Sequence, residues 1–230
     1  MGFISLATSG LRSRGFFIYM NRVTFLIDGF NVYHSILSLK RHTGYLAKWL
    51  NLSSLCKSYL NLFSKDARLK DIYYFSALAH YLSAKDPNKI TKHKNYIACL
   101  ESLGLNVELG RFKEKDVFCD RCKSMILKHE EKETDVAIGV KLLEILFTDS
   151  CDSVIIVSGD TDLSPAIRKG TELFPNKRII FAFPFARKNK ELLSLAPESF
   201  SISKRQYIRH QLPNPVILKD GKEIYKPSSW

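Results

Sequence analysis

The chain has 230 residues, of which 45% are hydrophobic and 25% charged, a composition that argues against bulk disorder. Lysine and arginine number 35 against 23 acidic residues, a formal charge of +12, which favours nucleic acids and other polyanions as partners. No apolar run approaches the roughly 18 residues of a membrane span, so no membrane is expected as a partner. Five cysteines, an odd number, do not suggest a disulfide framework and fit a reducing cytoplasm better.

Strand and helix patterns alternate along most of the chain. Strands are expected at residues 23–27, 71–75, 107–109, 153–157 and 178–183, and helices at residues 31–39, 52–63, 87–103, 134–147 and 163–173. This alternation predicts an α/β fold, a three-layer α/β/α sandwich with a mostly parallel central sheet. In such a fold, ligands bind beyond the carboxyl ends of the strands. The helix at 134–147 is apolar all round, which predicts burial on most of its sides.

Three segments fall outside this alternation. Residues 1–19 are expected to be a non-native or flexible extension, because Met20 begins a segment that runs straight into the first strand. The main domain would then span residues 20–200. Residues 201–230 form a basic extension interrupted by Pro213 and Pro215, for which we expect a short helix followed by a loosely attached tail. Residues 111–132 are charged, show no clear period, and are expected to run over the surface.

A Cys-x-x-Cys pair lies within that surface segment. Cys119 and Cys122 have the spacing of half a zinc site, which His129, Cys99 or a second subunit would have to complete. The simpler interpretation is two reduced thiols in a surface turn. Zinc is therefore kept as an alternative at this position.

Aspartates occur at the ends of predicted elements. Asp28 follows the first strand, Asp160 and Asp162 follow the strand at 153–157, and Asp135 begins the helix at 134–147. Ordinary structural roles exist for three of them. Asp28 lies in an Asp-Gly turn, Asp162 could cap the next helix, and Asp135 suits the helix dipole. Asp160 has no such role, and neighbouring carboxylates repel each other unless a cation lies between them.

These positions predict one acidic site at one edge of the sheet. Oxygen ligands suit Mg²⁺ or Mn²⁺, and a basic protein with an acidic metal site suits phosphodiester hydrolysis. Glu130, Glu131 and Glu133 are expected to be solvated, although one of them could reach the metal. Neither nucleotide-binding glycine motif is present, and Phe30 stands where an aspartyl phosphatase would carry its second acid. The six histidines show no metal-binding spacing.

Three segments of the chain resemble the NYN domain family, in the LabA-like branch of the PIN-like nucleases. The segments are FLIDGFNVY, KETDVAIGVKLL and VSGDTDLSPAI, in the order in which the family has them. The resemblance implies a PIN-like fold, a divalent metal and RNA cleavage. It places metal-site acids at Asp28, Asp135, Asp160 and Asp162. It also matches Asn31 to a polar residue of the first motif and Ser158 to a small hydroxyl residue before the glycine. Leu163 departs from the family, which frequently has an aromatic residue there.

The sequence therefore predicts a metal-dependent endoribonuclease that leaves 5′-phosphate and 3′-hydroxyl ends. The alternatives are a non-catalytic RNA-binding or regulatory module of the same fold, and a phosphatase or nucleotide hydrolase. A homodimer and an inhibitory protein partner both stay open.

Overall fold

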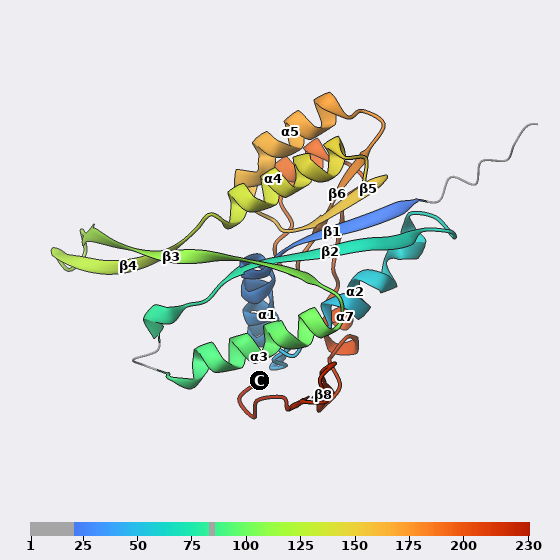
Figure 1. Cartoon of the computed structure of the whole chain (residues 1–230). Coiled ribbons are helices and arrows are strands. Elements are labelled where there is room, and N and C mark those ends of the chain that lie inside the picture. Colours follow the sequence, from blue (N-terminus) through green and yellow to red (C-terminus); the bar gives the residue numbers. More distant parts are fainter. Residues whose placement is uncertain (1–20, 83–85) are drawn as a thin grey trace, which may run out of the picture.

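The computed structural model describes residues 21–82 and 86–230, and the expectation for residues 1–19 lies outside them. A seven-stranded sheet forms the centre, in the order β4-β3-β2-β1-β5-β6-β7 (Figure 1). All neighbouring strands are parallel except β3 and β4. The predicted α/β fold with a mostly parallel sheet is thus confirmed. The strands are β1 Arg22–Asp28, β2 Arg68–Ala77, β3 Asn106–Cys119, β4 Ser124–Lys132, β5 Ser153–Val157, β6 Arg178–Phe183 and β7 Phe200–Ser201.

Helices cover both faces of the sheet, and Figure 1 shows α4 and α5 on the face opposite α1, α2 and α3. One face carries α1 Gly29–Thr43, α2 Leu52–Ser58, α3 Asn88–Ser102 and α7 Lys204–Arg209. The other carries α4 Thr134–Phe147, α5 Ser164–Leu173 and α6 Lys190–Leu195. Short 3-10 turns lie at Leu60–Leu62, His80–Leu82 and Thr161–Leu163. Within the described ranges, no helix is long and apolar enough to cross a membrane.

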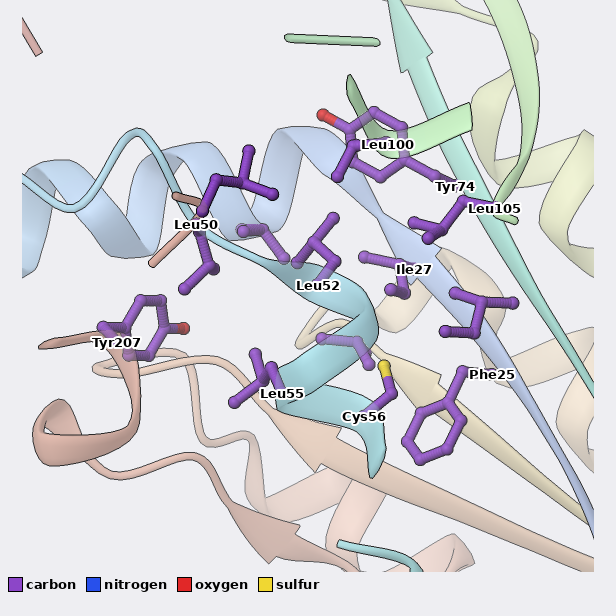
Figure 2. Packing of buried hydrophobic residues seen from close by; sticks show 14 of the residues in the cluster. Phe25, Ile27, Leu50, Leu52, Leu55, Cys56, Tyr74, Leu100, Leu105 and Tyr207 are labelled. Carbon is purple, nitrogen blue, oxygen red and sulfur yellow. The ribbon is translucent and has the colours of Figure 1, made fainter. Parts of the chain in front are cut away.

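The first strand divides the core into two apolar clusters. Phe25 and Ile27 pack with the helices of one face, whereas Leu26 packs with those of the other. Figure 2 shows the first cluster, in which Phe25 and Ile27 lie near Leu55 and Cys56 of α2. Side chains alternate between the two faces along a strand, so a strand covered on both sides is apolar throughout. This burial on both faces places β1 in the middle of the sheet. Its last residue, Asp28, lies at the carboxyl ends of the parallel strands.

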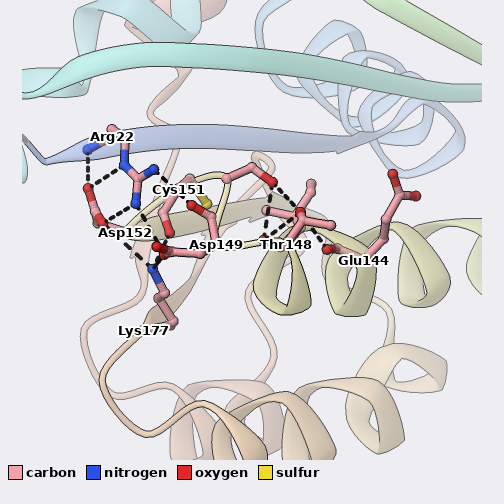
Figure 3. Close-up of polar contacts among 9 residues, drawn as sticks. Arg22, Glu144, Thr148, Asp149, Cys151, Asp152 and Lys177 are labelled. Carbon is pink, nitrogen blue, oxygen red and sulfur yellow. Dashed lines mark hydrogen bonds and ion pairs between the residues drawn. The ribbon is translucent and has the colours of Figure 1, made fainter.

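A cluster of charged side chains binds the start of β1, at the amino-terminal ends of the strands and away from the candidate site. The Arg22 guanidinium donates to both carboxylate oxygens of Asp152, at 3.1 and 2.9 Å, and to the Asp149 carbonyl oxygen at 2.8 Å. Lys177 binds Asp149 and donates to the Cys151 carbonyl oxygen at 2.7 Å (Figure 3). These bonds join β1, the segment before β5, and the start of β6. They therefore hold the register that aligns the other ends of the same strands.

Residues 111–132 lie at the surface as expected, but they form a long antiparallel hairpin, which the sequence analysis did not predict. The β3 and β4 strands pair from Arg111 with Lys132 to Cys119 with Ser124, and the hairpin projects beyond the helices (Figure 1). The expected short strand at 107–109 is the beginning of β3. Apolar side chains on the hairpin, such as Phe118 and Leu127, are exposed. With no buried face, the hairpin has no apolar alternation from which a strand could be recognised.

Helix α4 has the predicted bounds but not the predicted burial. Ile138 and Leu142 are fully buried, whereas Val136, Val140 and Phe147 are 70%, 60% and 80% exposed. The expectation that this helix is buried on most sides was therefore wrong. An apolar composition shows what a helix could bury, but not how many neighbouring elements are present to cover it.

The end of the chain packs against the domain, so the expectation of a loosely attached tail was also wrong. The Trp49 Nε1 atom donates to the Pro213 carbonyl oxygen at 3.0 Å, and Leu212 is buried. A small hairpin of β8 Val216–Ile217 and β9 Glu223–Ile224 follows, and Trp230 packs against the first core cluster. The expected short helix is α7. The expectation rested on two prolines and a basic composition, and it overlooked the few apolar side chains that pack this segment against the domain.

Candidate active site

Asp28 ends β1 and caps α1. Its Oδ1 atom accepts from the Asn31 backbone N–H at 2.9 Å. Its Oδ2 atom accepts from the Asn31 side-chain amide and from the Ser158 hydroxyl, both at 2.8 Å. The carboxylate is 2% exposed, so these donors replace the water that it loses. Asp28 is thus the N-cap of α1, a role that the sequence analysis did not assign to it and that leaves the bond from Ser158 unexplained.

Gly29 lets the end of β1 lie directly against β2. A Cβ atom at this position would lie 2.6 Å from the Phe75 carbonyl oxygen and 2.7 Å from the Tyr74 ring. Only glycine fits such a close approach. The residue after Asp28 thus sets where the carboxylate lies relative to the second strand.

The loop after β5 is hydrogen-bonded to the loop after β1. The Gly159 N–H donates to the Asn31 Oδ1 atom at 3.3 Å, and the Asp160 N–H donates to the Ser158 hydroxyl at 3.1 Å. Asp160 Oδ1 then accepts from the Asp162 N–H at 3.1 Å. Strand order reverses between β1 and β5, which is where open α/β sheets bind ligands.

The predicted acids influence one another electrostatically. Burial raises the pKa of Asp28, against the opposing effect of its hydrogen bonds, and Asp160 raises it further. Burial also raises the pKa of Asp135 to about 6, with further contributions from the charges of Asp28, Asp160 and Asp162. Glu131 also contributes to this shift. The four predicted aspartates therefore lie within electrostatic range of one another, after β1, after β5 and at the start of α4.

Two further residues lie near this site: Glu131, one of three glutamates considered from the sequence, and Arg187, which the sequence analysis did not name. Glu131 is partly buried and accepts from the Thr134 hydroxyl at 2.5 Å, and burial followed by the charge of Asp28 raises its pKa. The expectation that it is solvated was wrong, whereas Glu130 and Glu133 form ion pairs that remain accessible to solvent. Arg187 lies against Gly159, and within the described chain its buried Nε atom has no hydrogen-bond partner. Its position four residues after β6 is the signal that could have indicated it.

The acids suit a hard cation in kind, because all are oxygen donors whose mutual repulsion a cation would relieve. Among residues 21–82 and 86–230, however, no three His, Cys, Asp or Glu side chains are arranged to hold a metal ion. Asp28 already uses both oxygens in hydrogen bonds, and Asp162 is exposed. Mg²⁺ commonly keeps several waters and binds through one or two carboxylates plus substrate phosphate, so it does not require three direct protein ligands.

The cysteine pair lies at the turn of the β3–β4 hairpin. Cys119 pairs with Ser124, and the Cys122 sulfur lies 3.0 Å from the Ser124 hydroxyl. His129 is five positions further along the ladder, about 17 Å away at strand spacing, and it stacks on Tyr81. Cys99 is buried in the core. Neither residue reaches the pair, so a zinc site here would need ligands from a second molecule.

The fold is a three-layer α/β sandwich, with acidic side chains where the strand order reverses between β1 and β5. The NYN domain model matches residues 22–203, which is most of the chain. The chain therefore belongs to the NYN domain family. The predicted resemblance at family level is confirmed.

The chain is also similar to two other proteins. The chain is 26% identical to the 6-hydroxy-3-succinoylpyridine 3-monooxygenase HspA of Pseudomonas putida, over 91% of this chain and 75% of that protein. It also resembles the crystal structure of a Vibrio parahaemolyticus protein of unknown function, with a TM-score of 0.54 and 18% identity. That match covers 81% of this chain and 95% of the other. At this identity the structural likeness shows the fold alone.

Proposed function

We propose that this protein is a metal-dependent endoribonuclease of the LabA-like branch, which acts on RNA in a reducing cytoplasm. The observation that carries the proposal is the convergence of carboxylates from three separate segments at one sheet edge, where burial and mutual repulsion raise the pKa of Asp28 and of Asp135. A cap, a turn and a helix dipole explain single residues but not their convergence. The net charge of +12 and five free cysteines agree with an RNA partner and that compartment.

Each side chain has a definite part in this proposal. Asp28, Asp135, Asp160 and Asp162 would hold Mg²⁺ or Mn²⁺, which when bound activates water and stabilises the leaving oxygen. Asn31 and Ser158 hold Asp28 in one orientation through the 2.8 Å bonds to its Oδ2 atom. Arg187, beside Gly159, supplies a cation for the phosphate. Attack by water leaves the ribose 2′-hydroxyl unused, so the products are a 5′-phosphate and a 3′-hydroxyl.

The test compares wild type with Asp160→Asn and with Asp116→Asn, an acid on the projecting hairpin, as the matched control. Purified proteins are incubated with total RNA and Mn²⁺ or Mg²⁺, and the new ends are mapped. We expect cleavage that EDTA abolishes and that falls at least about a hundredfold in Asp160→Asn while the control keeps it. Wild-type activity in Asp160→Asn, or 2′,3′-cyclic phosphates that persist in EDTA, would refute the assignment.

A second candidate is favoured by the 26% identical relative, whose name states a monooxygenase acting on a hydroxypyridine. A cavity lined by aromatic side chains next to Asp28 has room for such a ring. Monooxygenation consumes dioxygen and a two-electron reductant. Oxygen uptake that depends on 6-hydroxy-3-succinoylpyridine in the presence of NADH would establish this candidate, and its absence together with RNA cleavage would dismiss it.

A further inference from the structure

A cavity of about 630 Å³ lies between α1, the end of β2 and α3, within the size range of small-molecule sites. Gly29 and Phe30, the two residues after Asp28, form part of its wall. Tyr74, whose ring packs against Gly29, forms another part. The cavity is therefore adjacent to the candidate active site along the same turn of chain.

One side of the cavity is lined by aromatic side chains, of which Tyr81 has one ring face stacked on His129. Phe30, Tyr33 and Tyr81 line it, with exposures of 42%, 36% and 36%. Trp230 lines it as well. Exposed aromatic side chains gathered at one cavity are unusual on a monomer surface and are the means by which proteins stack unpaired bases.

Three lysines give the cavity its charge. Lys48, Lys89 and Lys92 line it, and among its described lining residues Asp86 is the one acid. Burial, followed by the charge of Lys89, lowers the pKa of Lys48, whose Nζ atom lies 5.7 Å from the ring centroids of Tyr33 and Trp230. Lys92 forms a 3.9 Å ion pair with Asp86, and the exposed Lys89 is the lysine best placed to bind an anion.

The interior of the cavity offers neutral hydrogen-bonding groups. His93 Nε2 lies 3.5 Å from the Ser76 hydroxyl, and both residues line the cavity. Burial lowers the pKa of His93 to about 4, so the ring is neutral at pH 7 and presents one donor and one acceptor. Such a pair suits the edge of an uncharged base.

We propose that this cavity binds one unstacked nucleotide of single-stranded RNA, with the base between the aromatic side chains and a phosphate at the lysines. The next phosphate of the strand then lies at the aspartates. This assignment deepens the proposed nuclease function and rests on it for the identity of the strand. Binding in the cavity itself needs neither metal nor cleavage.

The experiment measures binding of a fluorescent single-stranded RNA pentamer to the full chain in EDTA. Tyr33→Leu removes a stacking ring and Lys89→Ala removes an exposed cation. Lys94→Ala, on the same helix but outside the cavity, is the matched control. We expect each cavity variant to weaken binding about tenfold and the control to change it less than about twofold. Ala79→Trp, which places a ring into the cavity, should weaken it at least as much.

Competition then identifies the ligand. Adenosine 5′-monophosphate should displace the pentamer, whereas adenosine and inorganic phosphate alone should do so only at about tenfold higher concentration. Equal binding by all cavity variants would overturn the proposal. So would displacement by nicotinate but not by the nucleotide, which would assign the cavity to free aromatic acids.

The outcome is separable from that of the nuclease proposal. Asp160→Asn should lose cleavage but bind the pentamer in EDTA at least as tightly as wild type, because the substitution removes a charge that repels the neighbouring phosphate. If the pentamer binds through the cavity but no RNA is cut, the catalytic assignment fails and the cavity assignment stands. If RNA is cut with unaltered KM in the cavity variants, the cavity assignment fails alone.

Discussion

Replacing Asp135 with Asn should stabilise the metal-free protein at pH 8. A pKa of about 6 in place of 3.8 means that burial and neighbouring acids oppose ionisation of this carboxylate in the folded state. The difference corresponds to about 3 kcal/mol for a fully desolvated group. Asp135 is only partly buried, and solvent screening reduces the figure to about 1–2 kcal/mol.

An opposing term comes from α4. Asp135 lies in the first turn of that helix, where a negative charge contributes about 0.3–1 kcal/mol through the helix dipole. The net gain on substitution is therefore about 1 kcal/mol. For a domain of this size, that corresponds to a rise in Tm of about 2–4 °C.

The sign of the pH dependence follows from the raised pKa. A carboxylate whose folded pKa lies above its unfolded value costs stability above about pH 6, and the cost is lost as the pH falls toward the unfolded pKa. Asp135→Asn should thus raise Tm at pH 8 in EDTA and change it little at pH 4.5. Mn²⁺ should raise the Tm of wild type more than that of the variant.

The assay is thermal unfolding of wild type, Asp135→Asn and the hairpin control Asp116→Asn at both pH values. Because each variant is compared with wild type at the same pH, other titrating groups cancel. A lower Tm for Asp135→Asn at pH 8 would refute the repulsion inferred for the site.

Three further predictions concern the scaffold. Gly29→Ala, whose Cβ would lie 2.6 Å from the Phe75 carbonyl oxygen, should cost at least about 2 kcal/mol in urea unfolding; wild-type stability would contradict the close approach. Arg22→Ala should lower the free energy of unfolding by about 1 kcal/mol at pH 7. Because Arg22 lowers the pKa of Asp152, this loss of stability should shrink below about pH 4, and a loss that thermal melts show to be independent of pH would contradict the pairing. Replacing Cys119 and Cys122 by Ser should change Tm by less than about 1 °C, and elemental analysis should find no stoichiometric zinc; bound zinc would show that a second molecule completes the site.

The elements that the sequence predicted best are those buried by neighbours on the sheet. Strands β5 and β6 and helix α4 have the expected bounds because continuous apolar runs indicate them. The β3–β4 hairpin was not predicted from the sequence. Its strands pair through backbone hydrogen bonds and expose both faces to solvent, so they show no apolar alternation. The packing of residues 201–230 was not predicted either, because only a few of its side chains are buried and the overall composition of the segment is basic.

The site was predictable to the extent that it depends on strand ends. Asp28 and Asp160 follow buried strands, and parallel topology brings such ends to one edge. Glu131 could not be distinguished from Glu130 and Glu133, and Arg187 was not recognised, because their positions depend on how a hairpin and a loop turn back toward that edge. The hydrogen bond of Asn31 to Asp28 likewise depends on side-chain direction rather than on sequence spacing alone.

The hydrogen bond between Ser158 and Asp28 joins residues 130 positions apart, and this separation has a consequence during synthesis. A nascent chain that has emerged only through β3 can pair its first three parallel strands, but one edge of β1 has no neighbour. The Asp28 carboxylate then lacks the hydroxyl that later binds it, and the acids after β5 do not yet exist. The proposed site is therefore complete only after the loop that follows β5 has been synthesised, and a product interrupted before that point lacks it.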